Sequence, residues 1–196
     1  MIDYIKGKIT ELTPANVVIE TTGIGYFINI SLTTYTALAN QTEAQLFVYE
    51  AIREDAFVLF GFMSREERQL FLLLISVSGI GANTARVIMS SYSALEIQEM
   101  IATSNVSALN AIKGIGTKTA QRIIVDLKDK ILKVSVGTGT QGTFVSATAA
   151  IREETMAALV MLGYTASASQ KAIDTILKHD PALSVEQVIK NALKML

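Results

Sequence analysis

The chain has 196 residues, of which half are hydrophobic, and its formal net charge is −1. This length favours two or three small domains over one, and no apolar stretch is long and charge-free enough to cross a membrane. The absence of cysteine excludes disulfides and thiolate metal sites. Because the N-terminus lacks the basic start and apolar core of a signal peptide, we expect a cytoplasmic protein.

Charge is distributed unevenly along the chain. Residues 1–63 hold three basic and seven acidic side chains, whereas residues 64–132 hold eight basic and six acidic ones. Any contact with nucleic acid should therefore lie in the second segment. Because its positive surplus is small, such a contact must depend on where each charge lies more than on bulk attraction.

Residues 1–63 have the pattern of a small β-barrel. Short runs of β-branched and aromatic residues alternate with Gly and polar turns, as is typical of closed barrels. Five strands are expected, at 4–9, 17–20, 26–30, 46–50 and 57–61, with a short helix at 34–38. A barrel of this size predicts an OB-fold, and a small SH3-like barrel is the alternative.

Two adjacent carboxylates lie between the last two predicted strands. The sequence Arg53-Glu54-Asp55-Ala56 indicates a hairpin tip. The simplest interpretation of Glu54 and Asp55 is a soluble polar turn. The alternative is that two exposed carboxylates repel phosphates and so restrict where nucleic-acid strands can pass.

At Ser64 the hydrophobic pattern becomes helical and remains so to residue 132. Ser64 and Ser93 are each followed by Glu three residues later, which is the capping-box spacing. We expect Ser104 to cap a short helix, and residues 117–130 to form the longest helix of this segment.

One short phrase occurs twice within residues 64–132. Gly-Ile-Gly-Ala-Asn-Thr-Ala-Arg begins at Gly79, and Gly-Ile-Gly-Thr-Lys-Thr-Ala-Gln-Arg begins at Gly114. Each copy predicts a helix, a tight turn and a second helix. The glycines can adopt φ > 0 and allow a ligand to approach the backbone closely. The unpaired N–H groups and the dipole of the second helix favour a phosphate oxygen there.

The repeated phrase defines the candidate DNA-binding residues. They are Gly79, Gly81, Asn83, Thr84 and Arg86 in the first copy, and Gly114, Gly116, Thr117, Lys118, Thr119 and Arg122 in the second. The second copy should make the stronger electrostatic contact, because Lys118 has no charged counterpart in the first turn. Such groups contact phosphates and not base edges, so binding should be independent of sequence and sensitive to salt. The simpler alternative is that each turn only joins two helices.

The remaining residues predict a tether and a small helical domain. Gly, Ser and Thr dominate residues 133–148, which predicts a flexible linker. Residues 149–196 predict a UBA-like bundle of three helices. The first helix is expected to end at Gly163, the second to span about 166–178, and the third to start after Ser184. So small a bundle has little room for a catalytic pocket, which favours a docking module.

No catalytic, metal or cofactor site is predicted. The residues around Lys118 do not match a phosphate-binding P-loop, and a helix, not a strand, precedes Gly79, unlike a dinucleotide fingerprint. The one histidine, His179, is expected in solvent near a helix end. Asp126 and Asp129 alternate with lysines, which is typical of a solvated helix face.

The ordered set of features resembles the RuvA family over the full length of the chain. The matching segments are Gly23-Ile24-Gly25-Tyr26, Arg53-Glu54-Asp55-Ala56, Phe60-Gly61-Phe62, Gly79-Ile80-Gly81 and Lys113 to Arg122. The resemblance implies an α+β multidomain protein that binds Holliday junctions for branch migration, in recombination, DNA repair and the SOS response. It implies a four-fold homotetramer, or a double one forming an octamer. It also makes Glu54 and Asp55 an acidic pin at the crossover.

The same resemblance implies partners. The C-terminal domain of the family docks on hexamers of the RuvB AAA+ ATPase, and by similarity Leu159, Leu162 and Tyr164 are the expected contacts. The family also acts with the RuvC resolvase. The ATPase belongs to the partner, so no catalysis and no cofactor are expected in this chain. The departure from the family pattern is at Asn83, near which many members carry a lysine.

Two other functional classes remain open on the residues alone. Helix-hairpin-helix glycosylases and lyases hold DNA in the same way, but they need a catalytic Asp or Lys in a base pocket. A protein adaptor that binds no DNA could also be built from the barrel and the C-terminal bundle.

Overall fold

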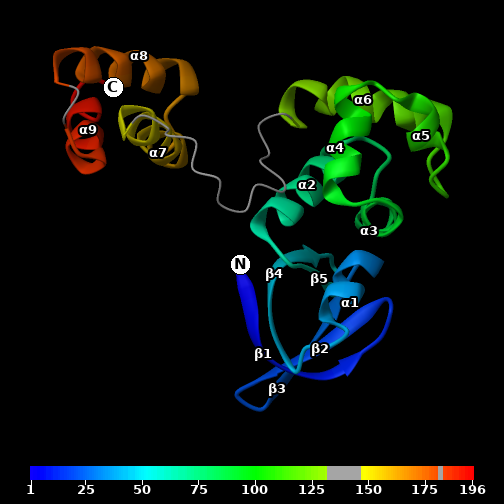
Figure 1. The fold of residues 1–196 in the computed structure, drawn as a ribbon. Coiled ribbons are helices and arrows are strands. Elements are labelled where there is room, and N and C mark those ends of the chain that lie inside the picture. Colours follow the sequence, from blue (N-terminus) through cyan, green and yellow to red (C-terminus); the bar gives the residue numbers. More distant parts are fainter. Residues whose placement is uncertain (132–146, 181–182) are drawn as a thin grey trace. The chain divides into compact units, whose positions relative to one another are not determined.

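The computed structural model describes residues 1–131, 147–180 and 183–196 (Figure 1). The chain forms two compact units, Met1–Thr138 and Gly139–Leu196. The first unit holds the strands and the first six helices, and the second holds the last three helices.

The first unit begins with a closed barrel of five strands in the order β1-β2-β3-β5-β4. The strands are β1 (Tyr4–Leu12), β2 (Asn16–Thr21), β3 (Ile24–Asn29), β4 (Glu43–Ile52) and β5 (Phe57–Phe62). β3 and β5 pair in parallel and the other neighbours are antiparallel. Helix α1 (Leu32–Leu38) connects β3 to β4. This topology confirms the predicted OB-fold.

Alternating apolar residues on the strands fill the barrel. Ile5, Val17, Ile19, Ile28 and Leu46 are buried in one cluster. Gly7 is required where β1 crosses β2, because a Cβ there would lie 2.1 Å from the Glu20 carbonyl oxygen.

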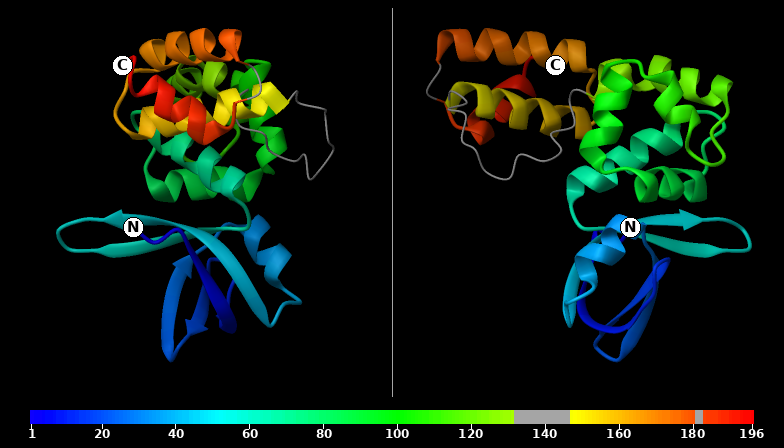
Figure 2. Two further views of the ribbon diagram at one scale, coloured as in Figure 1. Left: turned by 90° about the vertical axis from the view of Figure 1, so that its left-hand side faces the viewer. Right: turned by 45° about the vertical axis from the view of Figure 1, so that its right-hand side comes forward.

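The β4–β5 hairpin continues beyond the barrel and projects from it (Figure 2). Its last pair joins Ile52 to Phe57. The Arg53 N–H donates to the Ala56 carbonyl oxygen at 2.8 Å and closes the turn. Glu54 and Asp55 therefore occupy the tip, as predicted.

Five helices follow the barrel in the first unit. They are α2 (Arg65–Ser76), α3 (Ala82–Ser91), α4 (Ala94–Ala102), α5 (Val106–Asn110) and α6 (Thr117–Ile131). Ser64 caps α2, and a complete capping box starts α4 at Ser93.

The prediction that Ser104 caps α5 is wrong. Asn105 is the N-cap, and its side-chain oxygen accepts from the Ala108 N–H at 3.0 Å. Ser104 instead adopts φ 58° in the tight connection after α4. Its hydroxyl accepts a hydrogen bond of 2.9 Å from the Lys128 ammonium group.

A second hydrophobic core, around Phe71 of α2, joins β4 and β5 to the helices. The ring of Phe71 is fully buried, with ring centroids 5.4 Å from Tyr49, 5.4 Å from Phe60 and 4.9 Å from Phe62. Aromatic packing at these distances stabilises the contact beyond its buried area. The strands and helices on either side of residue 63 are therefore one body, although each has its own pattern in the sequence.

The second unit is a bundle of three helices, as predicted. They are α7 (Ala147–Met161), α8 (Ala166–His179) and α9 (Val185–Ala192). Leu159, Ile173 and Val188 are fully buried at its centre, one from each helix. The Thr165 hydroxyl caps α8, and a capping box at Ser184 begins α9.

Candidate nucleic-acid interface

The two repeated phrases form two turns of the same geometry. The Ile80 N–H donates to the Val77 carbonyl oxygen at 3.0 Å, and the Ile115 N–H donates to that of Ile112 at 3.0 Å. Gly79 and Gly114 have φ values of 94° and 90°. A hydrogen bond from the fourth residue to the first, with positive φ at the third, is the pattern of a type II turn. Only the first glycine of each phrase uses the positive φ that was expected of both.

The central isoleucine anchors each turn. Ile80 and Ile115 are both buried in the core of the first unit. Because these side chains point inward, the flanking glycines face outward, and a Cβ at any of the four would meet no atom within 4 Å.

The second glycine of each phrase is exposed and directly precedes a helix. Gly81 is the N-cap of α3, with φ −88° and ψ 170°, and no side chain caps this helix. Gly116 has the same place before α6, where its carbonyl oxygen accepts from the Ala120 N–H at 2.9 Å. Neither the backbone angles of Gly81 nor its internal packing requires glycine. What glycine provides at this position is room for an external group at the helix N-terminus.

The side chains around the two turns differ in charge. Lys118 and Asn83 are exposed at the start of their helices, whereas Thr84 and Thr119 are half-buried. The Thr117 hydroxyl lies 3.5 Å from the Asn110 side-chain oxygen. Lys113, which sequence reasoning left out of the candidate set, is also exposed, and it lies within the second turn itself. The first turn has Ser78 at that place, so one lysine lies in the second turn and the other, Lys118, at the start of the helix that follows it.

The two arginines of the candidate set contact protein acceptors. Arg86 Nη1 donates to the Ala15 carbonyl oxygen at 3.1 Å and to Asn29 Oδ1 at 3.3 Å, so it joins α3 to the barrel. Arg122 Nη1 donates to the Ser78 carbonyl oxygen at 3.1 Å. Both were predicted as phosphate contacts from their position behind the turns.

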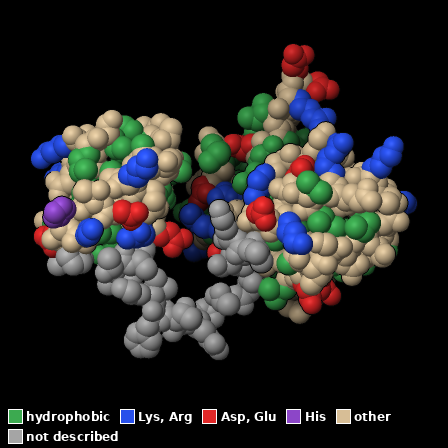
Figure 3. Space-filling model, turned by 90° about the horizontal axis from the view of Figure 1, so that it is seen from above, with side chains coloured by type: hydrophobic (Ala, Val, Ile, Leu, Met, Phe, Trp, Pro, Cys, Tyr) green, Lys and Arg blue, Asp and Glu red, His purple; other side chains and the backbone are tan. Residues whose placement is uncertain are grey.

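The acidic tip belongs to the same unit as the turns. Glu54 and Asp55 are both exposed to solvent. A cavity of about 120 Å³ lies between the hairpin and the start of α3, lined in part by Arg53, Val58 and Asn83. Figure 3 shows Lys and Arg side chains spread over one face of the first unit and acidic side chains at the end of a projection.

The predicted partner contacts in the second unit divide into buried and exposed residues. Leu159 is fully buried, so its prediction as a surface contact is wrong: its position in α7 faces the bundle core. Leu162 is 60% exposed and continues an apolar surface with Met161, which is 89% exposed. Tyr164 is half-buried beside them.

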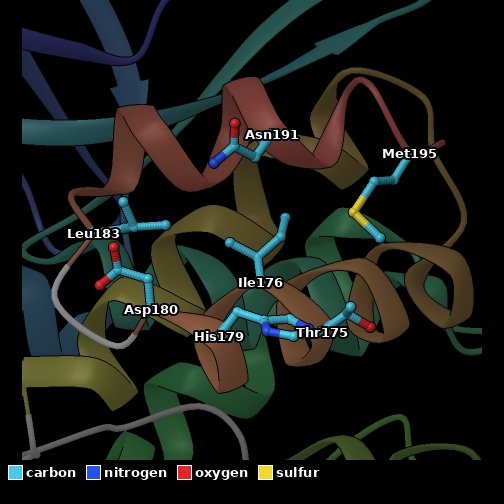
Figure 4. Close-up of a pocket in the computed structure, with 7 residues that line it drawn as sticks. All are labelled: Thr175, Ile176, His179, Asp180, Leu183, Asn191 and Met195. Atoms are coloured by element: carbon cyan, nitrogen blue, oxygen red, sulfur yellow. The ribbon is translucent and has the colours of Figure 1, made fainter.

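A hollow of about 360 Å³ lies between α8 and α9 (Figure 4). His179 and Asp180 at the end of α8 and Met195 near the C-terminus are among its lining residues. His179 is exposed, as predicted, and within the described residues no group of three His, Asp or Glu side chains could hold a metal ion. None of the helices in the described ranges is long and apolar enough to cross a membrane.

Comparison with known proteins identifies relatives over the full length. The RuvA N-terminal domain family matches residues 1–61, the SAM-like helix-hairpin-helix tandem matches 71–129, and the RuvA C-terminal domain matches 150–196. The Holliday junction branch migration complex subunit RuvA of Bacteroides fragilis is 54% identical over 201 residues, which covers 100% of both chains. The subunits of the same name are 55% identical in Parabacteroides distasonis and 41% identical in Cytophaga hutchinsonii, again over 100% of both chains.

Proposed function

This chain belongs to the RuvA family, and we propose that it binds four-way junction DNA without reading its sequence, as the non-catalytic subunit of a bacterial branch-migration complex. The relatives are named as subunits of such a complex, which supports this role. A protein of this kind would work on chromosomal DNA in the cytoplasm.

The observation that carries the proposal is the pair of matching turns in one compact unit. Each presents a glycine-flanked helix N-terminus to solvent, with open space where a side chain would lie. Two such N-termini offer N–H donors and partial positive charge to two phosphate groups. Lys113 and Lys118 add two positive charges at the second turn. None of these groups has the geometry to read base edges.

The acidic tip has a complementary role in this proposal. Glu54 and Asp55 project on the hairpin away from the barrel core, so they would lie against DNA that the turns hold. Their negative charge repels phosphates and would keep strands apart where arms exchange. The family resemblance makes this site the crossover of the junction.

The finer assembly follows from family membership and is part of the proposal. Four copies would form a homotetramer, or eight an octamer, around an open junction. The second unit would dock on the RuvB ATPase through the exposed apolar surface at Leu162 and Tyr164, and the RuvC resolvase would act on the same junction. Docking through a separate unit suits a motor that moves relative to the DNA-binding unit.

The alternative of a glycosylase or lyase has no support from the site. Asp126 and Asp129, the acidic candidates after the second turn, are both exposed on α6. A base-processing enzyme needs its acid or base inside a pocket that encloses an extruded base.

A competition gel shift tests the proposed function. A labelled four-way junction is bound to the full-length protein and competed with unlabelled junction or with linear duplex of the same sequence, at two salt concentrations. We expect the junction to compete far better than the duplex, scrambled junction sequences to bind equally, and affinity to fall with salt. Equal competition by the duplex would leave only a generic DNA-backbone binder.

A further inference from the structure

We propose that Arg122 is a positioning residue that sets the spacing between the two phosphate-binding turns, and not itself a phosphate contact. The inference rests on the proposed function, since it assigns how the two turns act together. It departs from the prediction made from the sequence, in which Arg122 lies on the same helix face as Lys118 and contacts a phosphate.

The contact that carries the inference joins the first turn to α6, the helix that follows the second turn. Ser78 is the second residue of the first turn, and Arg122 lies on α6, the helix that begins at the second turn. Arg122 Nη1 donates to the Ser78 carbonyl oxygen at 3.1 Å. The acceptor is main chain, so the bond fixes the backbone of the turn itself and not a mobile side chain.

A one-residue offset between the two phrases explains why the arginines differ. The first phrase continues Thr84-Ala85-Arg86, and the second continues Thr119-Ala120-Gln121-Arg122. One residue in an α-helix turns a side chain by about 100°. Arg86 therefore reaches the barrel, where it donates to Ala15 and Asn29, whereas Arg122 reaches the first turn.

The two arginines fix neighbouring parts of the first motif: Arg86 holds α3 to the barrel, and Arg122 holds the turn that precedes α3. Asn29, which accepts from Arg86, also donates through Nδ2 to the Leu59 carbonyl oxygen of β5 at 3.2 Å. The planar guanidinium has its donors in a fixed geometry, so it constrains direction as well as distance. A pair of turns held at one spacing binds two phosphates without first having to be ordered, which raises affinity without adding an ionic contact.

A distance measurement on the protein without DNA directly tests whether the bond from Arg122 to Ser78 fixes the spacing of the turns. The chain has no cysteine, so spin labels can be placed at Ser91→Cys on α3 and Asp129→Cys on α6, both at exposed positions. The labelled full-length chain is co-assembled with excess unlabelled chain, and the label–label distance distribution is measured by pulsed electron paramagnetic resonance. We expect Arg122→Ala to broaden or shift this distribution. An unchanged distribution would overturn the proposal.

Salt-dependent junction binding provides the second test, with Lys118→Ala as the matched control on the same helix. We expect Arg122→Ala to weaken junction binding by roughly three- to tenfold, the effect of about one hydrogen bond, with the slope of log Kd against log salt unchanged. Lys118→Ala should reduce that slope by about one. An equal reduction in Arg122→Ala would show that Arg122 is a phosphate contact and overturn the proposal. If the wild-type protein does not prefer a four-way junction over linear duplex, the proposed function fails. The distance measurement still tests whether Arg122 fixes the spacing of the turns.

Discussion

Arg68 Nη2 lies 2.7 Å from Asp3 Oδ1, and Nη1 of the same guanidinium donates to the carbonyl oxygens of Asp3 and Val48. This contact joins α2 to β4 and to the residue that precedes β1. The guanidinium groups of Arg68 and Arg65 also lie over the Phe47 ring, 5.7 Å and 5.2 Å from its centroid. The N-terminal residues of the chain are thereby fixed to the helices.

Low pH should remove the stabilising effect of the contact between Asp3 and Arg68. The hydrogen bond from Arg68 holds the pKa of Asp3 below its ordinary value. Since the folded state prefers the ionised carboxylate, its stabilising effect is present above the pKa of the unfolded chain, about 3.9, and is lost as pH falls through the lower folded pKa. We expect Asp3→Asn to lower stability at pH 7 and to flatten the acid limb of the stability curve, measured by thermal unfolding across pH. A variant with the wild-type acid limb would contradict this.

The two turns should differ in their ionic contribution. We expect Lys118→Ala and Lys113→Ala each to reduce the salt slope of junction binding by about one. The reverse change, Asn83→Lys, gives the first turn a charge comparable to that of Lys118 and should raise both the affinity and the slope. Gel shifts at several salt concentrations measure this, and Lys171→Ala in the second unit is the control for a change in net charge alone.

Substitutions of the two glycines in the first motif should affect stability and DNA binding separately. Gly79 has φ 94°, so Gly79→Ala should cost about 1–2 kcal/mol in the free energy of unfolding. Gly81→Ser suits the N-cap angles of α3 and should leave stability near wild type. Its hydroxyl, however, would occupy the N–H groups and the space that we assign to phosphate. Thermal unfolding and junction binding measured on both variants test this, and a Gly81→Ser protein with normal binding would exclude the first helix N-terminus as a contact.

Neutralising the tip should strengthen binding. We expect the double variant Glu54→Gln with Asp55→Asn to bind the junction about two- to fivefold more tightly, because it removes repulsion between exposed charges and phosphates. Branch migration with the partner motor should be disturbed at the same time. The measurement is junction affinity at low and high salt, where the gain should shrink as salt screens it. Weaker binding would contradict the role of the tip.

The two leucines of the second unit should have opposite effects. Leu159 is fully buried, so Leu159→Ala should destabilise the bundle by about 2–5 kcal/mol. Leu162 is 60% exposed, so Leu162→Ala should change stability by less than about 0.5 kcal/mol and reduce stimulation of the motor ATPase. Junction binding should stay normal in Leu162→Ala. Full stimulation by that variant would place the docking surface elsewhere on the bundle.

Much of the fold is predictable because its signals are local. The alternating strands, the caps at Ser64 and Ser93 and the paired glycine turns each depend on residues close together in the sequence. The turns in particular could be placed from Gly79 and Gly114 alone, since positive φ favours glycine.

The parts that sequence reasoning missed depend on distant neighbours or on helix phase. The acceptor of Arg122 is 44 residues away, and that of Arg86 at Ala15 is 71 residues away. No local pattern states which acceptor a long side chain will reach. Leu159 and Leu162 are three residues apart on and after the same helix, yet only the first faces the core. Ser104 and Asn105 are both good caps, and the path of the chain between α4 and α5 decides between them.

The core around Phe71 has a mechanical consequence. It packs α2 against both strands of the hairpin that carries the acidic tip, while Ile80 and Ile115 insert the two turns into the same cluster. Under the proposed function, a force on DNA bound at the turns acts on the same packed core that holds the hairpin of the acidic tip. Under the proposed function, DNA strands would separate around a tip that stays in place, and the partner motor would move DNA instead of bending the protein.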